Sequence, residues 1–201
     1  MTAGGALSNP LSKWGSAMII REATFLDARE IAEVSVDSWR STYQGILSRP
    51  FLHSLCYDRL EEIFRQRLFS GNPSDFIYVA EDEKHRIIGY ATGGRERTGL
   101  TRFEGELYEL YIPKPYQLQG IGRKLVSVAA RRFLREKIGN LLIWVLVYNP
   151  SCAFYQSLGG SIVHQKNTNF GGTRLLEIGY GWSDIRKLAR ITETAGPMFL
   201  L

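Results

Sequence analysis

The segment that most constrains the fold of this chain is a strand, a glycine turn, a helix and a second strand in unbroken succession. The first strand is EGELYELYIP, residues 104–113, which is rich in aromatic and branched side chains. The turn is PYQLQGIGRKL, residues 115–125, and a helix of about 20 residues is predicted to follow it. The second strand is LLIWVLVYN, residues 141–149, an almost uninterrupted apolar run typical of a strand buried on both faces. Two such strands joined through a helix predict an α/β domain.

Two helices are predicted ahead of this unit. The first covers residues 26–43 and is opened by Asp27, with Glu30 three residues later as in a capping box. The second covers residues 50–69 and has Pro50 in its first turn, where the missing N–H has no intrahelical partner to lose.

The remaining periodic segments predict strands. Runs of strand-forming residues bounded by turn residues occur at 18–23, 76–82, 86–96, 161–170 and 173–182. The second and third of these runs form one antiparallel hairpin, and the last two form another around Gly171 and Gly172. A short helix is predicted at 151–160, ahead of the last hairpin.

The length of 201 residues suits one compact domain with short tails. Residues 18–185 are assigned to the domain, and 186–201 to a short helix and a C-terminal tail. Residues 1–17 are predicted to be a flexible extension, because they lack the basic start and apolar core of a secretory signal. Translation could start at Met1 or at Met18, and the sequence does not decide between them.

Composition argues against several classes of function. No run approaches the roughly 18 apolar residues that a membrane span needs. Cys56 and Cys152 form no metal-like or redox-like pair, so neither a disulfide framework nor a zinc site is predicted, and a reducing cytoplasm fits best. The net charge of +5 raises nucleic acid as a partner, but much of the excess lies in one helix, at 122–137, where a solvated face explains it.

The glycine turn suits an anion. Where a strand ends and a helix begins, the first backbone N–H groups lack intrahelical partners and the helix dipole is positive. Gly120 and Gly122 leave the amides of residues 118–124 open to a pyrophosphate, and Arg123 and Lys124 add charge at the rim. A plain glycine-rich turn is the alternative. Neither G-x-x-x-x-G-K-[ST] nor a complete G-x-G-x-x-G is present, so the common nucleotide motifs do not explain the turn.

The spacing Q-x-x-G-x-G is satisfied by Gln117, Gly120 and Gly122. With it the chain resembles the GCN5-related N-acetyltransferase (GNAT) family, in which this motif holds the pyrophosphate of acetyl-CoA. VYNPSCAFYQSLGG, residues 147–160, is similar to the family's fifth-strand exit and following helix, and the order of elements matches over residues 18–182. The resemblance implies the GNAT fold, a mixed, mostly antiparallel sheet of about seven strands with a central βαβ unit and flanking helices.

The resemblance also implies acetyl-CoA as co-substrate and assigns residues to it. Backbone at the end of the family's fourth strand lies along acetyl-CoA, Asn149 bonds its pantetheine region, and Tyr155 points its hydroxyl at the thioester sulfur. The residues so implicated are Tyr111, Ile112, Pro113, Gln117, Leu118, Gln119, Gly120, Ile121, Gly122, Arg123, Lys124, Asn149, Ser151 and Tyr155. Family habit and the exposed face of the last hairpin predict a homodimer.

Catalysis needs an acid and a base. A phenol with a pKa of about 10 is protonated at neutral pH, so Tyr155 can donate to the departing thiolate, with core packing as the alternative role. The base candidates are Glu106 and Glu109, and Glu106 stands eleven residues before Gln117, a position the family often uses. Alternation puts the two glutamates on opposite faces, but the bulge usual in the family's fourth strand changes that parity. Trp144, where some relatives carry a glutamate, shifts the preference to Glu106.

The acceptor side is set by the early helices, where SWRSTYQGIL, residues 38–47, resembles many small-molecule members. Trp39 and Tyr43 share a helix face, and they either pack in the core or line a pocket for an amine on an apolar body. The sequence predicts acetyl transfer from acetyl-CoA to a primary amine of a small molecule, by direct attack in a ternary complex. The alternatives are a peptide or protein amine as acceptor, and a non-catalytic acyl-CoA-binding regulatory module.

Overall fold

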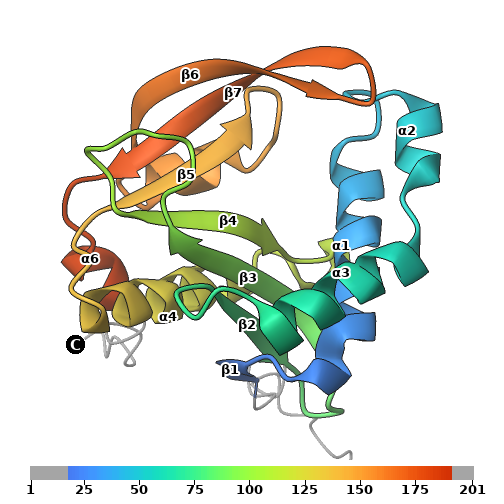
Figure 1. Cartoon of the computed structure of the whole chain (residues 1–201), viewed down its shortest axis with the longest axis horizontal. Coiled ribbons are helices and arrows are strands. Elements are labelled where there is room, and N and C mark those ends of the chain that lie inside the picture. Colours follow the sequence, from blue (N-terminus) through green and yellow to red (C-terminus); the bar gives the residue numbers. More distant parts are fainter. Residues whose placement is uncertain (1–17, 192–201) are drawn as a thin grey trace, which may run out of the picture.

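A seven-stranded sheet runs through the part of the protein that the computed structural model describes, residues 18–191 (Figure 1). Its strands are β1 (Ile19–Glu22), β2 (Phe76–Glu81), β3 (Ile87–Arg95), β4 (Gly105–Tyr111), β5 (Leu141–Leu146), β6 (Ser161–Phe170) and β7 (Thr173–Trp182). They are ordered β1-β2-β3-β4-β5-β7-β6, and only β4 and β5 run parallel among these neighbours. The predicted mixed, mostly antiparallel sheet is confirmed.

Helices cover both faces of this sheet. They are α1 (Ala28–Thr42), α2 (Arg49–Ser54), α3 (Tyr57–Ser70), α4 (Ile121–Arg135), α5 (Cys152–Ser157) and α6 (Arg186–Ala189), with 3-10 turns at Phe25–Asp27 and Lys114–Tyr116. One core cluster joins α4 and α6 to one face, and a second joins α1 and α3 to the other. Figure 1 shows α1, α2 and α3 grouped on the side opposite α4 and α6. Among the described helices, none combines the length and hydropathy that crossing a bilayer requires.

The prediction of one continuous helix over 50–69 is wrong, because the segment forms two helices, α2 and α3. Leu55 and Cys56 are extended and separate α2 from α3. The guanidinium of Arg40 donates to the carbonyl oxygens of Leu52, at 3.4 Å, and Leu55, at 2.8 Å. These contacts satisfy carbonyl groups that a continuous helix would have bonded itself, so a tertiary interaction outweighs local helix propensity here.

The start of α1 also differs from the prediction. The capping box is formed by Thr24 and Asp27 at the preceding 3-10 turn, with the Thr24 N–H donating to the Asp27 carboxylate at 2.6 Å. Glu30, the predicted box partner, instead accepts the N–H of Ile87 at 2.8 Å, from the start of β3. Its carboxylate therefore ties α1 to the sheet and does not cap the helix.

The chain after β7 is partly core. Leu188 is buried against α4, and the Ser127 hydroxyl donates to the carbonyl of Ala189 at 2.9 Å. The segment assigned to a tail thus begins with residues that close the core, while the predicted extension at 1–17 and the end of the tail at 192–201 lie outside the described residues. Helix α4 has 15 residues, fewer than predicted, and Lys137 just beyond it has a φ of 63°.

Strands β4 and β5 diverge, and this divergence creates the site. They pair only from Gly105 to Leu107 on the β4 side. Between β3 and β4 the register shifts, since Thr92 pairs with Glu109 but Gly93 pairs with Leu107, which leaves Tyr108 as the extra residue of a bulge. The bulge predicted for this strand is present. It bends β4 away from β5 and opens the sheet between them.

Candidate active site

A groove of about 630 Å³ occupies the opening between β4 and β5 and extends to the first turn of α4 and to α5. Among the predicted site residues, those on its lining are Tyr43, Glu109, Tyr111, Ile112, Gln117, Leu118, Gly120, Ile121, Gly122, Arg123, Asn149, Ser151 and Tyr155. The predicted residues that do not line it are Trp39, Glu106, Pro113, Gln119 and Lys124. The groove therefore brings the glycine turn, both ends of the Asn149 to Tyr155 motif and one of the two glutamates to a single surface.

The first turn of α4 forms the anion-binding end of the groove. Gly120 is the N-cap and has a φ of +80°, and a Cβ built on it would meet nothing within 4 Å. The N–H of Lys124 donates to the Gly120 carbonyl at 3.1 Å, so the amides of Ile121 to Arg123 precede the first bond of the helix. These amides and the positive end of the dipole face the groove, where an anion is stabilised.

Gly122 lines the groove and also has a packing role. A Cβ on it would lie 3.2 Å from the ring of Phe154 and 3.4 Å from the side chain of Ile112. Its missing side chain therefore allows α4 to pack closely against Phe154. Phe154 also lines the groove and was missed in the sequence, although it precedes Tyr155 in the recognised motif.

The motif glutamine Gln117 and the nearby Gln119 support the loop that carries the turn. Gln117 donates from its side-chain amide to the carbonyl of Ile112 at 2.8 Å, and Gln119 donates to that of Pro115 at 2.9 Å. Both hydrogen bonds lie within the segment that follows β4 and stabilise its conformation. Arg123 lies at the rim, where its guanidinium donates to the hydroxyl of Ser157 at 3.0 Å.

Tyr155 lies at the inner end of the groove. Its side chain comes from α5 and is 6% exposed, packed beside Tyr180 with ring centroids 5.9 Å apart. Burial raises the pKa of Tyr155 well above its ordinary value of 10. The hydroxyl therefore keeps its proton throughout the neutral range and is available as a donor.

Asn149 joins the exit of β5 to the end of α1. Its side-chain NH₂ donates to the hydroxyl of Tyr43 at 3.0 Å, and its oxygen accepts the N–H of Ser151 at 2.8 Å. Both Asn149 and Tyr43 are buried, and burial raises the pKa of Tyr43. The two bonds fix the wall of the groove on the side of α5.

We expect Asn149→Leu to lower the free energy of unfolding by about 1–3 kcal/mol, because the buried Tyr43 hydroxyl and Ser151 N–H both lose a partner. Urea denaturation of the full chain measures this. Asn140→Leu is the matched control. The Asn140 side chain also accepts one hydrogen bond, from the Glu104 N–H, and donates one, to the Arg102 carbonyl. These bonds are exposed, so water can replace the lost partner in the variant. Equal losses in the two variants would contradict the expectation.

Trp39 belongs to an aromatic cluster beside the groove. Its ring centroid lies 4.8 Å from that of Tyr43, 5.5 Å from Phe170, 6.2 Å from Phe51 and 6.4 Å from Tyr111. This cluster fastens α1 and α2 to the tip of the β6–β7 hairpin. Of the two predicted aromatics, Trp39 is half-buried in this cluster and does not line the groove, whereas Tyr43 is buried in the cluster and also lines the groove.

Glu106 and Glu109 lie on the same face of the sheet, so simple alternation is wrong here. The Tyr108 bulge shifts the parity: Leu107 faces α4, whereas Glu109 accepts the hydroxyl of Tyr90 at 2.9 Å on the face that α1 and α3 cover. Glu106, next to Leu107, must face the same way as Glu109.

The two glutamates differ in access. Glu106 accepts both the backbone N–H of Arg97, at 2.9 Å, and its guanidinium, at 3.2 Å, and its side chain is 5% exposed. Glu109 is paired with Arg67 at 3.1 Å but is 25% exposed and lines the groove. Only Glu109 is in a position to meet a group bound in the groove.

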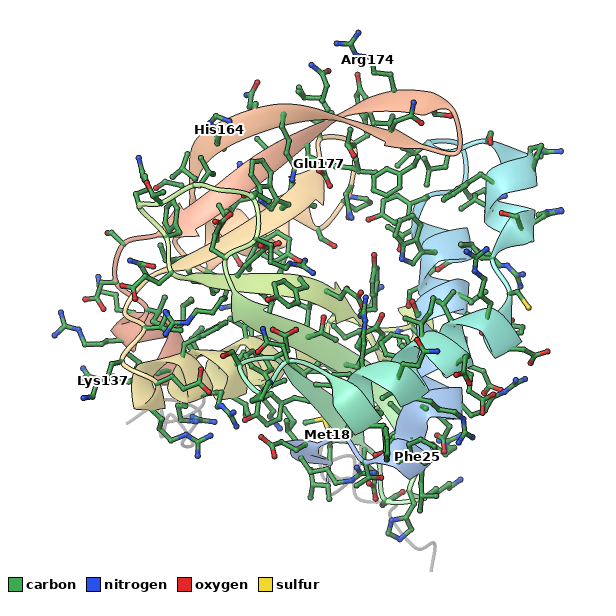
Figure 2. All side chains as sticks on the ribbon, viewed as in Figure 1. Met18, Phe25, Lys137, His164, Arg174 and Glu177 are labelled. Atoms are coloured by element: carbon green, nitrogen blue, oxygen red, sulfur yellow. The ribbon has the colours of Figure 1, made fainter. Side chains whose placement is uncertain are left out.

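Trp144 also lines the groove. Its indole N–H is buried without a partner, one of three such side-chain atoms in residues 18–191. The ammonium of Lys166 lies 3.9 Å from the centroid of the ring, on the side of β6. Figure 2 shows the hairpin above this region, with Arg174 projecting outward and Glu177 beneath it.

Comparison with known proteins gives a consistent picture. The model of the Acetyltransferase (GNAT) family matches residues 36–160. The chain is 37% identical to the uncharacterized N-acetyltransferase YuaI of Bacillus subtilis over 169 residues, which is 84% of this chain and 95% of that one. It is 22% identical to the spermidine N(1)-acetyltransferase of Thermoplasma acidophilum, over 75% of this chain and 92% of that one.

Solved structures share the fold. The PaiA N-acetyltransferase of Thermoplasma acidophilum, in complex with coenzyme A, superimposes with a TM-score of 0.64 at 22% identity, over 80% of this chain and 98% of that one. YncA of Salmonella typhimurium, solved with acetyl-CoA, gives a TM-score of 0.62 at 21% identity, over 92% of this chain and all of that one.

Proposed function

This chain belongs to the GNAT acetyltransferase family and is an N-acetyltransferase of that type, and we propose that it acetylates a primary amine of a small molecule from acetyl-CoA, by direct attack in a ternary complex. One observation carries this proposal. The groove is lined both by an open helix N-terminus at Gly120 and by a buried, protonated Tyr155. A non-catalytic acyl-CoA-binding module would need the first feature but not the second.

The residues of the groove fit acetyl-CoA. The amides of the first turn of α4 suit its pyrophosphate, and the β4 end at Tyr111 and Ile112 offers backbone groups, since β5 has diverged there. The relatives solved with coenzyme A and acetyl-CoA support the same assignment.

Acetyl-CoA, when bound, supplies an acetyl group activated as a thioester, which a neutral amine attacks at the carbonyl carbon so that a C–N bond forms and the C–S bond breaks. We assign the role of acid to Tyr155, which gives its phenolic proton to the departing sulfur. Backbone amides of β4 beyond the last pair with β5 are available to stabilise the charge that develops on the carbonyl oxygen.

We assign the role of base to Glu109, which accepts the proton that the amine loses. It lines the groove, while Glu106 is enclosed with Arg97 and does not. This assignment reverses the preference drawn from spacing alone, because spacing does not show which carboxylate is reachable. Glu106 holds Arg97 in place instead.

Glu109→Gln should lower kcat/KM about tenfold near neutral pH, because the amide keeps the hydrogen-bonding shape but cannot accept a proton. The loss should shrink toward pH 10, where an alkylamine with a pKa of about 10 is increasingly neutral without help. Steady-state rates measured by thiol release across this pH range test both statements. Glu106→Gln is the matched variant, and a larger loss there than in Glu109→Gln would return the role of base to Glu106.

The proposed function itself is tested by incubating the full chain with acetyl-CoA and a panel of amines. We expect thiol release that depends on one class of acceptor, with mass spectrometry showing one added acetyl group on the acceptor. Spermidine belongs in the panel because one relative is named for it, and peptides with a free N-terminus or lysine test the protein-directed alternative. Binding of acetyl-CoA with no acetylated product from any amine or peptide would favour the regulatory module. The homodimer and the cytoplasmic location stay predictions.

A further inference from the structure

Charged residues on the acceptor face of the sheet occur in matched pairs. On β4 and β7, three glutamates lie on the face toward α1 and α3, and each has a cationic partner: Glu106 has Arg97, Glu109 has Arg67, and Glu177 has Lys166. The N···O distances are 3.2, 3.1 and 3.5 Å respectively. This face therefore offers no excess of negative charge that would attract a polycation.

A second cavity, of about 340 Å³, adjoins the groove where the end of α3 leads into β2. Tyr108, the bulge residue of β4, lines both spaces. Arg67 and Arg97, the cations paired with the two candidate bases, both line the second cavity. The guanidinium of Arg97 lies 3.2 Å from the centroid of the Tyr108 ring, which fixes its plane at the boundary between the two spaces.

The two guanidinium groups keep donors to spare. Each has five N–H donors, and the described side-chain hydrogen bonds use one nitrogen of Arg67, toward Glu109, and one of Arg97, toward Glu106. The ion pairs hold both groups in place before any ligand binds. Because an arginine fork binds a planar oxyanion through two parallel bonds, such pre-positioned groups suit a carboxylate.

Thr92 is a second, independent sign of a ligand. It is 3% exposed and lines the second cavity, and its hydroxyl has no hydrogen-bond partner although it is buried. It pairs with Glu109 across β3 and β4, so the hydroxyl lies beside the proposed base. A buried hydroxyl without a partner is costly, and a bound oxyanion would satisfy it.

The second cavity is also lined by two acidic residues, and both already have partners. Glu22 is paired with Arg132, at 2.9 Å, and Asp75 accepts the hydroxyl of Tyr108 at 3.1 Å. The lining thus holds three arginines and two carboxylates, before an acceptor binds. Each of the three arginines is already paired with a glutamate, so the cavity carries no excess of positive charge. Recognition of an anion would depend on the N–H donors of Arg67 and Arg97 that these pairs leave unused.

We propose that the acceptor carries an oxyanion beside its primary amine, in the simplest case the carboxylate of an amino acid, with Arg67 and Arg97 binding the anion while the amine lies at Glu109. The proposal rests on the proposed function and names the substrate class of that site. A polyamine would bring a second ammonium group toward two guanidinium groups and would be disfavoured by like-charge repulsion. A carboxamide of the same amino acid would lose the charge-assisted bonds but keep the amine and the shape.

The first experiment compares acceptors on the unmodified full chain. Each of the proteinogenic amino acids is assayed beside its own carboxamide, with spermidine as the polyamine, by acetyl-CoA-dependent thiol release. We expect the best amino acid to exceed its carboxamide about tenfold or more in kcat/KM, and spermidine to be poorer still. Equal rates for acid and carboxamide, or a preference for spermidine, would overturn the proposal.

The second experiment uses variants and a ratio as readout. Arg67→Gln and Arg97→Gln should each lower the ratio of kcat/KM for the amino acid to kcat/KM for its carboxamide about tenfold. Arg65→Gln is the control: Arg65 lies on the same helix as Arg67, is paired with Glu61 at 2.6 Å, and does not line the second cavity. It should leave the ratio unchanged.

The ratio separates recognition of the anion from damage to the base or to the fold. If either arginine acted only by holding its glutamate, or if its loss merely loosened the protein, both acceptors would suffer equally and the ratio would stay constant, which contradicts the proposal. Acetylation of spermidine or carboxamides without a preference for acids would remove this inference but leave the proposed function standing. No thiol release with any amine would remove both.

Discussion

Replacement of Gly120 by glutamate should abolish measurable binding of acetyl-CoA, with affinity reduced about 100-fold or more. A side chain at this position projects into open space within the groove, since its Cβ would meet no other atom within 4 Å. The new carboxylate would stand at the amides of the first turn of α4, where it would occupy the place of the pyrophosphate and repel it. Calorimetric titration of acetyl-CoA into the folded variant measures the loss.

The control for Gly120→Glu must share its backbone strain. Gly120 has a φ of +80°, a conformation that costs a residue with a Cβ roughly 1–2 kcal/mol, so some loss of stability is expected in any case. Gly99→Glu matches it, because Gly99 has a φ of +82°, also meets nothing within 4 Å, and lies off the groove. This control should lose similar stability and bind acetyl-CoA normally. Unchanged affinity in Gly120→Glu, with a folded protein, would show that the turn does not hold the anion.

Tyr155→Phe should lower kcat about 100-fold while changing the affinity for acetyl-CoA less than threefold, because it removes a proton donor and nothing else. Burial raises the pKa of the Tyr155 hydroxyl, so in the unmodified protein the acid stays protonated above neutral pH and its own ionisation does not limit the rate there. Single-turnover rates and calorimetric binding separate the two quantities.

Tyr180→Phe is the matched control for this substitution. Tyr180 is another buried tyrosine, packed against Tyr155 with ring centroids 5.9 Å apart, but it does not line the groove. We expect its loss to alter stability modestly and to leave kcat within about twofold. A normal kcat in Tyr155→Phe, or an equal fall in both variants, would withdraw the role of acid from Tyr155.

Much of the fold follows from local patterns in the sequence. All seven strands are predicted close to their observed bounds, because alternation, branched residues and the paired glycines at 171 and 172 act over a few residues. The errors have a common cause. The break at Leu55 and the loss of Glu30 as a capping residue both arise where a side chain bonds to a segment outside its own predicted helix, and periodicity carries no record of such bonds.

Some features of the candidate site could likewise be predicted from the sequence, and others could not. Gly120 and Tyr155 line the groove as the motif implies, but the structure gives Gly122 a packing role against Phe154. Tyr108 is the residue that sequence alone could not place, because a bulge depends on the register between β3 and β4. That single extra residue brings Glu106 and Glu109 to one face and leaves only Glu109 on the groove.

The sequence by itself determined the donor end of this protein. A helix N-terminus with a glycine cap is built from a few consecutive residues, so its spacing is visible in the chain and its chemistry belongs to the backbone. Only the tertiary structure brings together the residues that we propose for the acceptor end. Arg67 meets Glu109 across 42 positions of sequence, from α3 to β4, and Thr92 joins them from β3. The physical reason is that charge pairing and burial depend on distance in space, which the order of residues does not state.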